Sequence, residues 1–95
     1  MKYIVDYTSK FKKQYKKAKK QGKDLNKLYS IIEKLANGES LENQNKNHNL
    51  ITDKIYKNCY ECHIEPDWLL IYQIKDNELI LLLIATGTHS ELFNN

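Results

Sequence analysis

Apolar and polar positions alternate at the start of the chain and then repeat at helical spacing. The alternation over residues 1–7 predicts a strand that puts three apolar side chains on one face: Tyr3, Val5 and Tyr7. Helical spacing of the next apolar residues predicts helices over about 10–21 and 25–37, capped at their N-termini by Ser9 and Asp24. Because a glycine follows each helix closely and the connection is short, the two helices should form an antiparallel hairpin.

The second half of the chain is patterned differently. Residues 38–53 are rich in Asn, Gln and Glu and predict a loop long enough to have a functional role. Three apolar stretches then predict strands over about 55–65, 68–75 and 78–86, separated by short polar turns. The last of these stretches is apolar on both faces, so it should be a central strand. Ser90 would cap a final helical turn.

This order of elements predicts an α+β fold in which an N-terminal strand and a helix hairpin precede a mainly antiparallel sheet, with both helices on one face of it. The 95 residues suffice for one compact core, so we expect a single domain over 1–95. The sequence begins with early charges and holds no apolar run near the ~20 residues that cross a bilayer. We therefore expect a cytoplasmic protein with no membrane contact.

Charge is distributed unevenly along the chain. The net charge is +3, but residues 1–23 hold nine Lys and one Asp, which gives +8, whereas residues 24–95 sum to −5. All of the basic residues apart from histidine are lysines, so phosphate contacts would lack the bidentate fork of arginine. The basic N-terminal part indicates an anionic partner, either a nucleic acid or an acidic protein.

Two cysteines precede a histidine with the C-x-x-C-H spacing of haem attachment: Cys59, Cys62 and His63. A zinc or haem site built on them is one interpretation of the sequence. However, residues three apart in a strand point to opposite faces, and no export signal is present. We therefore expect two reduced thiols, at least one of them in the core.

Titratable side chains gather near the ends of the predicted strands. His63 shares a polar strand face with Glu61, Asp67 follows at the hairpin end, and His89 comes directly after the central strand. If neighbouring strands end together, His63, Asp67 and His89 meet at one edge of the sheet. Three such groups would form a candidate acid–base site.

The chain resembles the RelE/ParE superfamily of toxins, and within it the YafQ-like branch that cleaves messenger RNA. Three motifs carry the resemblance in order: His48-Asn49-Leu50, then His63-Ile64-Glu65-Pro66-Asp67-Trp68 with Tyr72 beyond it, then Gly87-Thr88-His89 with a terminal Leu92-Phe93. The segment before the strand histidine departs from the family pattern, because Tyr56-Lys57-Asn58-Cys59-Tyr60 lacks the usual Gly and Arg. That departure puts one phosphate or structural contact in doubt.

The resemblance implies a RelE-like fold and the toxin of a type II toxin–antitoxin system. Such a toxin is a ribosome-dependent endoribonuclease that cuts messenger RNA without a metal or other cofactor. It is inhibited by its cognate antitoxin in a hetero-oligomeric complex. We therefore expect this chain to bind a cognate antitoxin and to act on messenger RNA on the ribosome.

Metal-free RNA cleavage needs a base for the 2′-OH, an acid for the departing 5′-oxygen and groups that stabilise the phosphorane. We assign His89 as general acid, His63 and Asp67 as base or as base plus orienting group, and His48 as a further proton or phosphate contact. Aromatic side chains can stack on bases or hold the shape of the site, and lysines can contact phosphate. The candidates for these RNA contacts are Trp68, Phe93, Lys46, Lys54 and Lys57.

Two other classes of function stay open at the level of the sequence. The first is a non-enzymatic ParE-like toxin that binds a protein target such as DNA gyrase, which would have no need of three histidines and Asp67 together. The second is the zinc- or haem-binding domain built on Cys59 and Cys62. Mapping of message ends would test the first alternative, and elemental analysis the second.

Overall fold

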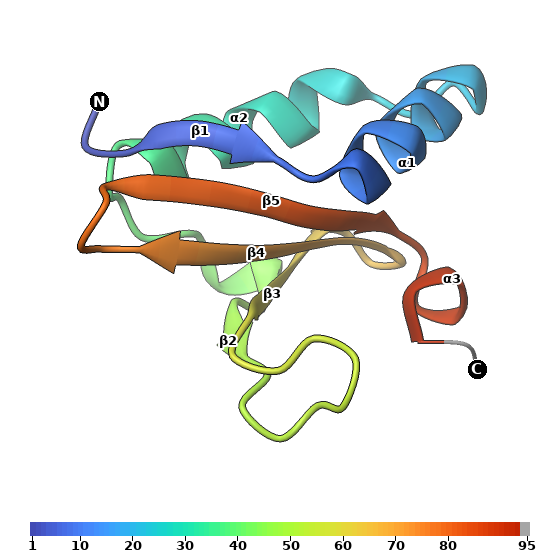
Figure 1. Cartoon of the computed structure of the whole chain (residues 1–95). Helices are drawn as coiled ribbons and strands as arrows, with labels where there is room; N and C mark the ends of the chain where they lie inside the picture. The colour runs from blue at the N-terminus through green and yellow to red at the C-terminus, as the bar shows by residue number, and fades with distance from the viewer. Residues whose placement is uncertain (94–95) are drawn as a thin grey trace.

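The computed structural model describes residues 1–93, which form one five-stranded sheet with two long helices on one face (Figure 1). The helices are α1 (Ser9–Lys20), α2 (Leu25–Ala36) and the short α3 (His89–Phe93), with a 3₁₀ turn η1 over Asn43–Asn45. The strands are β1 (Ile4–Tyr7), β2 (His48–Asn49), β3 (Tyr60–Glu65), β4 (Trp68–Lys75) and β5 (Ile80–Gly87). The predicted α+β class, with helices on one face, is confirmed.

The strands lie in the order β1-β5-β4-β3-β2. Strands β2 to β5 pair antiparallel, whereas β1 pairs parallel with β5 because the two helices carry the chain back across the sheet. The doubly apolar stretch is an interior strand, β5, between β1 and β4, as its sequence predicts. This order brings the end of β5 beside the β3–β4 hairpin, where Gly87 pairs with Leu69.

Side-chain caps fix where the two long helices begin. Asp24 caps α2 as predicted, since its carboxylate accepts a hydrogen bond from the Asn26 N–H at 3.1 Å. The cap of α1 is Thr8 rather than the predicted Ser9, because the Thr8 hydroxyl accepts from the Phe11 N–H at 3.0 Å. Gly22 and Gly38 follow the helices with φ of +75° and +76°, which is the left-handed conformation that ends a helix.

Three boundaries differ from the sequence-based expectation. The predicted strand 55–65 begins only at Tyr60, because the Asp53 carboxylate accepts the N–H groups of Ile55 and Tyr56 and folds residues 53–56 into a turn. His48, expected in a loop, lies on β2 and pairs with β3. The last helix is capped by Thr88 rather than Ser90, since the Thr88 hydroxyl accepts from the Glu91 N–H at 3.1 Å.

Apolar side chains pack on both faces of the sheet, and we name the faces by what covers them. The helix face carries α1 and α2 over the larger cluster, whose buried residues are Tyr3, Phe11, Ala18, Leu28, Ile31, Leu35, Ala36, Cys62, Ile64, Trp68, Leu70, Tyr72, Leu81 and Leu83. The loop face carries α3 and the loop over residues 50–59, and its buried residues are Tyr56, Cys59, Leu69, Ile71, Ala85 and Leu92.

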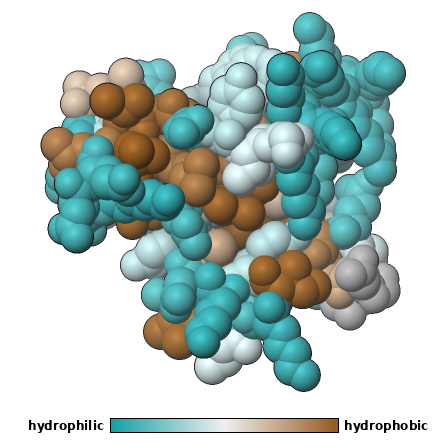
Figure 2. Space-filling view, in the orientation of Figure 1, coloured by the Kyte–Doolittle hydropathy of each residue, from teal (hydrophilic) through white to brown (hydrophobic). Residues whose placement is uncertain are grey.

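The surface of the molecule is also uneven. In the view of Figure 2 hydrophilic side chains cover α1, and hydrophobic ones gather over β1 and the turn before β5. Ile4 and Leu79 contribute to this hydrophobic area, with exposed fractions of 70% and 50%. In residues 1–93 no helix has the length and apolar character required to cross a bilayer.

Candidate active site

A polar cleft of about 700 Å³ opens on the loop face of the sheet. Two histidines, a buried glutamate and an aromatic ring line it, with the loop that follows β2 forming its other wall: His48, Glu61, His89, Phe93, Asn49, Leu50, Thr52, Asp53, Lys54 and Ile55. We call this the histidine cleft. It brings together segments that are more than forty residues apart in the sequence, because β2 pairs beside β3 while α3 follows β5.

His48 stands at the edge of the sheet and faces Glu61. The two residues are register partners between β2 and β3, which places the His48 Nε2 atom 3.3 Å from Glu61 Oε1. The other ring nitrogen, Nδ1, lies 2.8 Å from the Lys46 carbonyl oxygen. Half of the His48 side chain is exposed, so one edge of the imidazole is available to a ligand in the cleft.

His63 approaches the same glutamate from the other side. It lies two residues after Glu61 on β3, so both side chains leave the same face of the strand. Its Nε2 atom is 3.5 Å from Glu61 Oε1, and its Nδ1 atom is 3.1 Å from the Pro66 carbonyl oxygen. His63 does not line the histidine cleft itself. It borders a second pocket beside η1, together with Lys46.

Asp67 and His89 meet where the hairpin reaches the end of β5. The Asp67 carboxylate accepts a hydrogen bond from the backbone N–H of His89 at 3.0 Å. Asp67 therefore anchors the start of α3, and its position fixes where the His89 backbone enters the cleft. The predicted meeting of His63, Asp67 and His89 is therefore indirect. His63 contacts the backbone carbonyl of Pro66, Asp67 contacts the backbone N–H of His89, and the two imidazoles line different pockets.

Helix α3 is held in place by a capping box and an ion pair. The Glu91 carboxylate accepts the Thr88 N–H at 2.8 Å while Thr88 caps the helix, and Glu91 also pairs with Lys17 of α1. The hydrogen bond from Lys17, helped by that from Thr88, lowers the pKa of Glu91 to about 2. The ionised carboxylate thus connects the helix that carries His89 to α1.

Aromatic rings form one side of the cleft. The Phe93 ring stacks on the His89 imidazole with centroids 4.8 Å apart, and its other contact is with the Tyr56 ring at 5.4 Å. Tyr56 is buried, and the Lys10 ammonium donates to its hydroxyl at 2.8 Å. Phe93 is therefore positioned by packing and stays accessible to the cleft, as a residue that stacks on a base must be.

The other predicted RNA contacts have different positions. Trp68 is fully buried on the helix face and donates its indole N–H to the Thr86 hydroxyl at 3.0 Å. The prediction that Trp68 contacts a base directly is therefore wrong. Its role in holding the shape of the site stays a prediction. Lys54 lines the histidine cleft. Lys46 lies beside His63, and Lys57 is exposed on the loop that follows the cleft wall.

Sequence reasoning did not select Glu61 as a site residue, although it stands between two of the selected histidines. Its side chain is 7% exposed, which is unusual for a carboxylate. The signal was present in the alternation of β3, since a residue two positions before His63 must share its face. What the sequence did not contain was the pairing of His48 with that same face.

The two cysteines are separated by the sheet. Cys59 belongs to the cluster on the loop face and Cys62 to the cluster on the helix face, as the strand spacing predicted. Their sulfur atoms therefore cannot share a metal ion or one edge of a haem. Within residues 1–93, no three His, Cys, Asp or Glu side chains are grouped in a way that could hold a metal.

The chain is similar to characterised proteins over nearly its whole length. Residues 3–94 match the family described as the bacterial toxin of type II toxin–antitoxin system, YafQ. The mRNA interferase toxin YafQ of Escherichia coli BL21 is 38% identical over 90 residues, which are 94% of each chain.

Solved structures agree with this similarity. A metal-bound toxin from Helicobacter pylori superposes with a TM-score of 0.88 at 41% identity, over 96% of this chain and 99% of that one. The toxin chain of the E. coli DinJ–YafQ complex superposes with a TM-score of 0.85 at 37% identity, over 96% of this chain and 98% of that one.

Proposed function

The chain belongs to the YafQ family of bacterial type II toxins, and from this membership we propose that it is an endoribonuclease that cleaves messenger RNA on the ribosome. The observation that carries the proposal is the histidine cleft, which gathers His48, Glu61 and His89 around one open space. Because its substrate would be translated message, we propose that the protein acts in the cytoplasm.

The chemistry that these groups support is attack by the RNA's own 2′-OH. A base removes the 2′-OH proton, the oxygen attacks the adjacent phosphorus, and an acid protonates the 5′-oxygen as it leaves. The products are a 2′,3′-cyclic phosphate and a free 5′-OH. Imidazole suits both proton transfers because it exchanges protons near neutral pH. This route needs no metal ion, since the protein supplies both proton-transfer groups.

We assign the roles within this reaction from the contacts of each side chain. His89 serves as general acid, held over the cleft by Asp67 and by stacking on Phe93. His48 and His63 supply the base and a cationic contact for the phosphorane. Asp67 acts by orienting His89, because its Oδ1 atom accepts a hydrogen bond from the backbone N–H of His89.

The surrounding residues would bind the RNA chain. Phe93 provides a ring on which an unstacked base can pack. Lys54 is the phosphate contact at the cleft, with Lys46 and Lys57 further along the same surface. These lysines act as point charges, so they would set affinity more than sequence preference.

The test is cleavage of a defined message on ribosomes, read by primer extension with chemical analysis of the new ends. We expect His89→Ala and His48→Ala each to lower the cleavage rate by about 10²- to 10⁴-fold, which is the usual contribution of an acid or a base. Glu78→Gln is the control, because Glu78 is exposed in the turn at the opposite end of β5. Wild-type rates in both histidine variants would refute the assignment.

The same assay separates the finer parts of the proposal. A 2′,3′-cyclic phosphate on the upstream product supports attack by the 2′-OH, whereas a 5′-phosphate on the downstream product would exclude it. Omission of ribosomes tests whether free RNA is cut. Intact message combined with DNA damage would favour the alternative of a ParE-like toxin that binds gyrase, which the match to an mRNA interferase does not favour.

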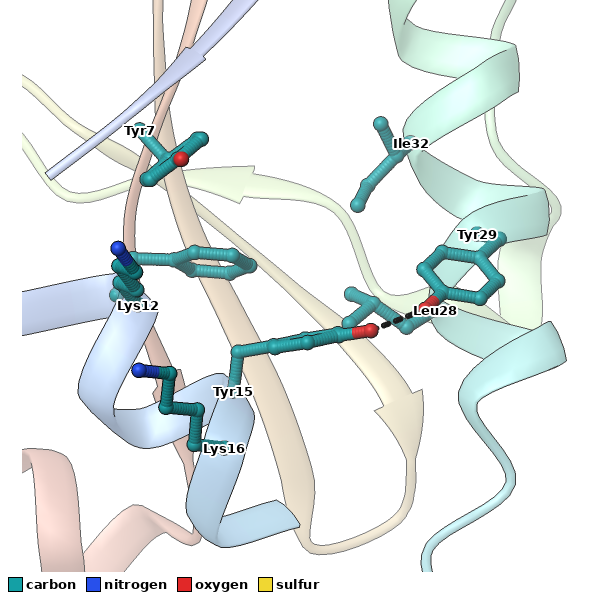
Figure 3. Close-up of a pocket in the computed structure, with 8 residues that line it drawn as sticks. Tyr7, Lys12, Tyr15, Lys16, Leu28, Tyr29 and Ile32 are labelled. Carbon is teal, nitrogen blue, oxygen red and sulfur yellow. Dashed lines mark hydrogen bonds between the residues drawn. The ribbon is translucent and has the colours of Figure 1, made fainter. Parts of the chain in front are cut away.

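We also propose that a cognate antitoxin binds this chain in a hetero-oligomer and uses a groove between α1 and α2. The groove has a volume of about 280 Å³ and is lined mainly by apolar side chains, with two lysines at its rim: Tyr7, Phe11, Tyr15, Leu28, Tyr29, Ile32, Lys12 and Lys16 (Figure 3). The hydroxyls of Tyr15 and Tyr29 are hydrogen-bonded to each other, so few polar groups inside the groove need a partner.

Charge and chemistry favour one kind of segment for this groove. Residues 1–23 carry +8, so a segment with acidic residues flanking apolar ones would match both the rim and the interior. We expect Lys12→Glu combined with Lys16→Glu to weaken antitoxin binding at least tenfold while cleavage is retained. The matched control is Lys13→Glu combined with Lys20→Glu, which reverses two exposed charges on the same helix outside the groove. Equal weakening by both pairs would refute this location.

A further inference from the structure

We propose that Glu61 is a positioning residue for RNA cleavage, and that its carboxylate holds His48 and His63 as one unit that shares a proton. This inference deepens the proposed function, because it concerns the same cleft and rests on the cleavage of RNA there. It assigns a role to the one buried carboxylate of the site, which the sequence motifs do not single out.

The geometry places a single oxygen atom between two imidazoles. Glu61 Oε1 is 3.3 Å from the Nε2 atom of His48 on β2 and 3.5 Å from the Nε2 atom of His63 on β3. The glutamate side chain is 7% exposed, His63 is 19% exposed and His48 is 50% exposed. Within this unit, water therefore reaches the His48 side chain most easily and the Glu61 carboxylate least.

The ring nitrogens that face away from Glu61 decide the protonation of the imidazoles. The Nδ1 atom of each ring contacts a backbone carbonyl oxygen, that of Lys46 for His48 and that of Pro66 for His63. A carbonyl oxygen can only accept, so each Nδ1 must carry a proton and donate. The Nε2 atom of a neutral ring then points a lone pair at the carboxylate, and only a second proton makes that contact attractive.

The burial of Glu61 requires such a proton. An ionised carboxylate that is removed from water is costly unless a positive charge lies beside it. Ile71, its partner on β4, is apolar, and among residues 1–93 the groups within ion-pair distance of Glu61 are the two histidines. Asp53, Lys54 and His89 line the same cleft at its other walls.

One imidazolium is enough to neutralise the charge of Glu61, so the two histidines can have different roles in the reaction. With one extra proton in the unit, one imidazole is charged and the other is neutral. The Nε2 lone pair of the neutral ring faces Glu61, so the half-exposed His48 must turn this atom toward the substrate to accept the 2′-OH proton. Accepting that proton makes both rings cationic. His48 then carries a positive charge at the cleft, where it stabilises the transition state, and His63 carries one on the other side of Glu61. The carboxylate also fixes the direction of both rings, so it acts through the histidines without touching the substrate.

The experiment compares Glu61→Gln, which keeps the shape and removes the charge, with Glu61→Asp, which keeps the charge. We expect Glu61→Gln to lower kcat at least about tenfold, as loss of the carboxylate that orients a catalytic imidazole does elsewhere, with KM for the message changed less than twofold. Glu61→Asp should recover part of this loss. Glu65→Gln is the control on the same strand, because Glu65 pairs with Lys27 outside the cleft.

The pH dependence distinguishes positioning from a merely structural role. Removal of the carboxylate changes the charge balance of the coupled pair, so the kcat–pH profile of Glu61→Gln should change shape, whereas a merely structural loss would lower kcat equally at every pH. The thermal unfolding midpoint of each variant shows whether the fold is retained. A kcat profile of unchanged shape, or wild-type kcat in Glu61→Gln, would overturn the inference.

A second measurement does not depend on activity. Nitrogen NMR of the histidine rings in the full-length protein reports the surroundings of each Nδ1 and Nε2 atom. We expect the ring nitrogen signals of His48 and His63 to differ between Glu61→Gln and wild type at the same pH, with those of His89 much less affected. If wild type does not cut message, the proposed function fails, whereas identical His48 and His63 ring signals in the two proteins refute the role of Glu61 itself.

Discussion

The two faces of the sheet are stabilised in different ways. Among residues 1–93, fourteen buried residues form one continuous cluster on the helix face, contributed mainly by the sheet and by α1 and α2. The cluster on the loop face has six, contributed by the sheet, the loop over residues 50–59 and α3. The helix face therefore contributes most of the apolar burial that drives folding. The loop face relies more on individual polar contacts, such as those of Asp53, Asp67 and Thr88.

The difference explains why the histidine cleft lies where it does. A cleft needs polar groups and open space, and both would weaken a packed core. The groove on the helix face is instead lined mainly by apolar side chains. Its volume is about 280 Å³, whereas that of the histidine cleft is about 700 Å³. The covered face is thus suited to hold the fold and bind a protein partner, and the other to admit RNA.

Two neighbouring leucines on β4 test this comparison most strongly. Leu70 and Leu69 are both fully buried, but Leu70 packs in the cluster of the helix face and Leu69 in that of the loop face. Replacing either by Ala should cost about 2–5 kcal/mol in the free energy of unfolding. We expect the larger loss for Leu70→Ala, because the small cluster beneath a loop can collapse onto the cavity.

Urea denaturation of the two variants measures these costs, and cleavage assays well below each midpoint measure the local effect. Leu69→Ala should lower activity more than Leu70→Ala, since Leu69 packs in the same cluster as Tyr56 and Leu92, which support the cleft wall and α3. A larger loss of stability for Leu69→Ala would contradict the proposed division between the faces.

The two cysteines provide a gentler probe of the same division. Burial raises the pKa of the Cys62 thiol to about 12, and it raises that of Cys59 as well. Both thiols should react slowly with iodoacetamide at pH 8, because the thiolate is the nucleophile. We expect Cys59 to react at least about tenfold faster than Cys62. Local opening of the loop exposes Cys59, whereas Cys62 becomes exposed only when the helix face unfolds.

Mass spectrometry of peptides after timed labelling gives both rates in one sample. Cys59→Ser and Cys62→Ser serve as controls that assign each signal. Equal rates for the two thiols would mean that both faces open together, and the comparison between them would then fail.

The sequence predicted the helix face well because local patterns determine it. The apolar spacing of α2 and the cap at Asp24 depend only on nearby residues, and both were placed correctly. The caps of α1 and α3 were each missed by one or two residues, since a Thr and a Ser stand within two positions of each other there and only the backbone geometry selects between them. The parallel pairing of β1 with β5 depends on contacts that are distant in the sequence.

The loop face was harder to predict for the same reason. Asp53 turns the chain through local hydrogen bonds that an apolar pattern does not reveal. The predicted strand therefore starts five residues before β3 does. The place of Glu61 in the candidate site depends on its pairing with His48. A strand of two residues, such as β2, is too short to be predicted from an apolar pattern. Trp68 was predicted to contact RNA because it is aromatic and follows Asp67 in the motif, but alternation along β4 turns it to the helix face.

The smallest effect that we predict concerns the ion pair between the faces. Glu91 of α3 pairs with Lys17 of α1, and its pKa in the folded protein is about 2, below the ordinary 4.5. A lowered carboxyl pKa stabilises the folded state fully above pH 4.5 and loses this contribution as the pH falls toward 2. Because the Lys17 side chain is 59% exposed and water screens the pair, the contribution should not exceed about 1 kcal/mol.

Trp68 can report this change, since it is the single tryptophan of the chain and lines a pocket together with Lys17 and Glu91. We expect its emission to change between pH 4.5 and 2 in wild type, before global unfolding, and to lack this step in Glu91→Gln. High salt should shrink the step, because screening weakens exposed pairs. A step of the same size in Glu91→Gln would show that α3 is held by its capping box and by Asp67 alone, so that the loop face does not depend on α1.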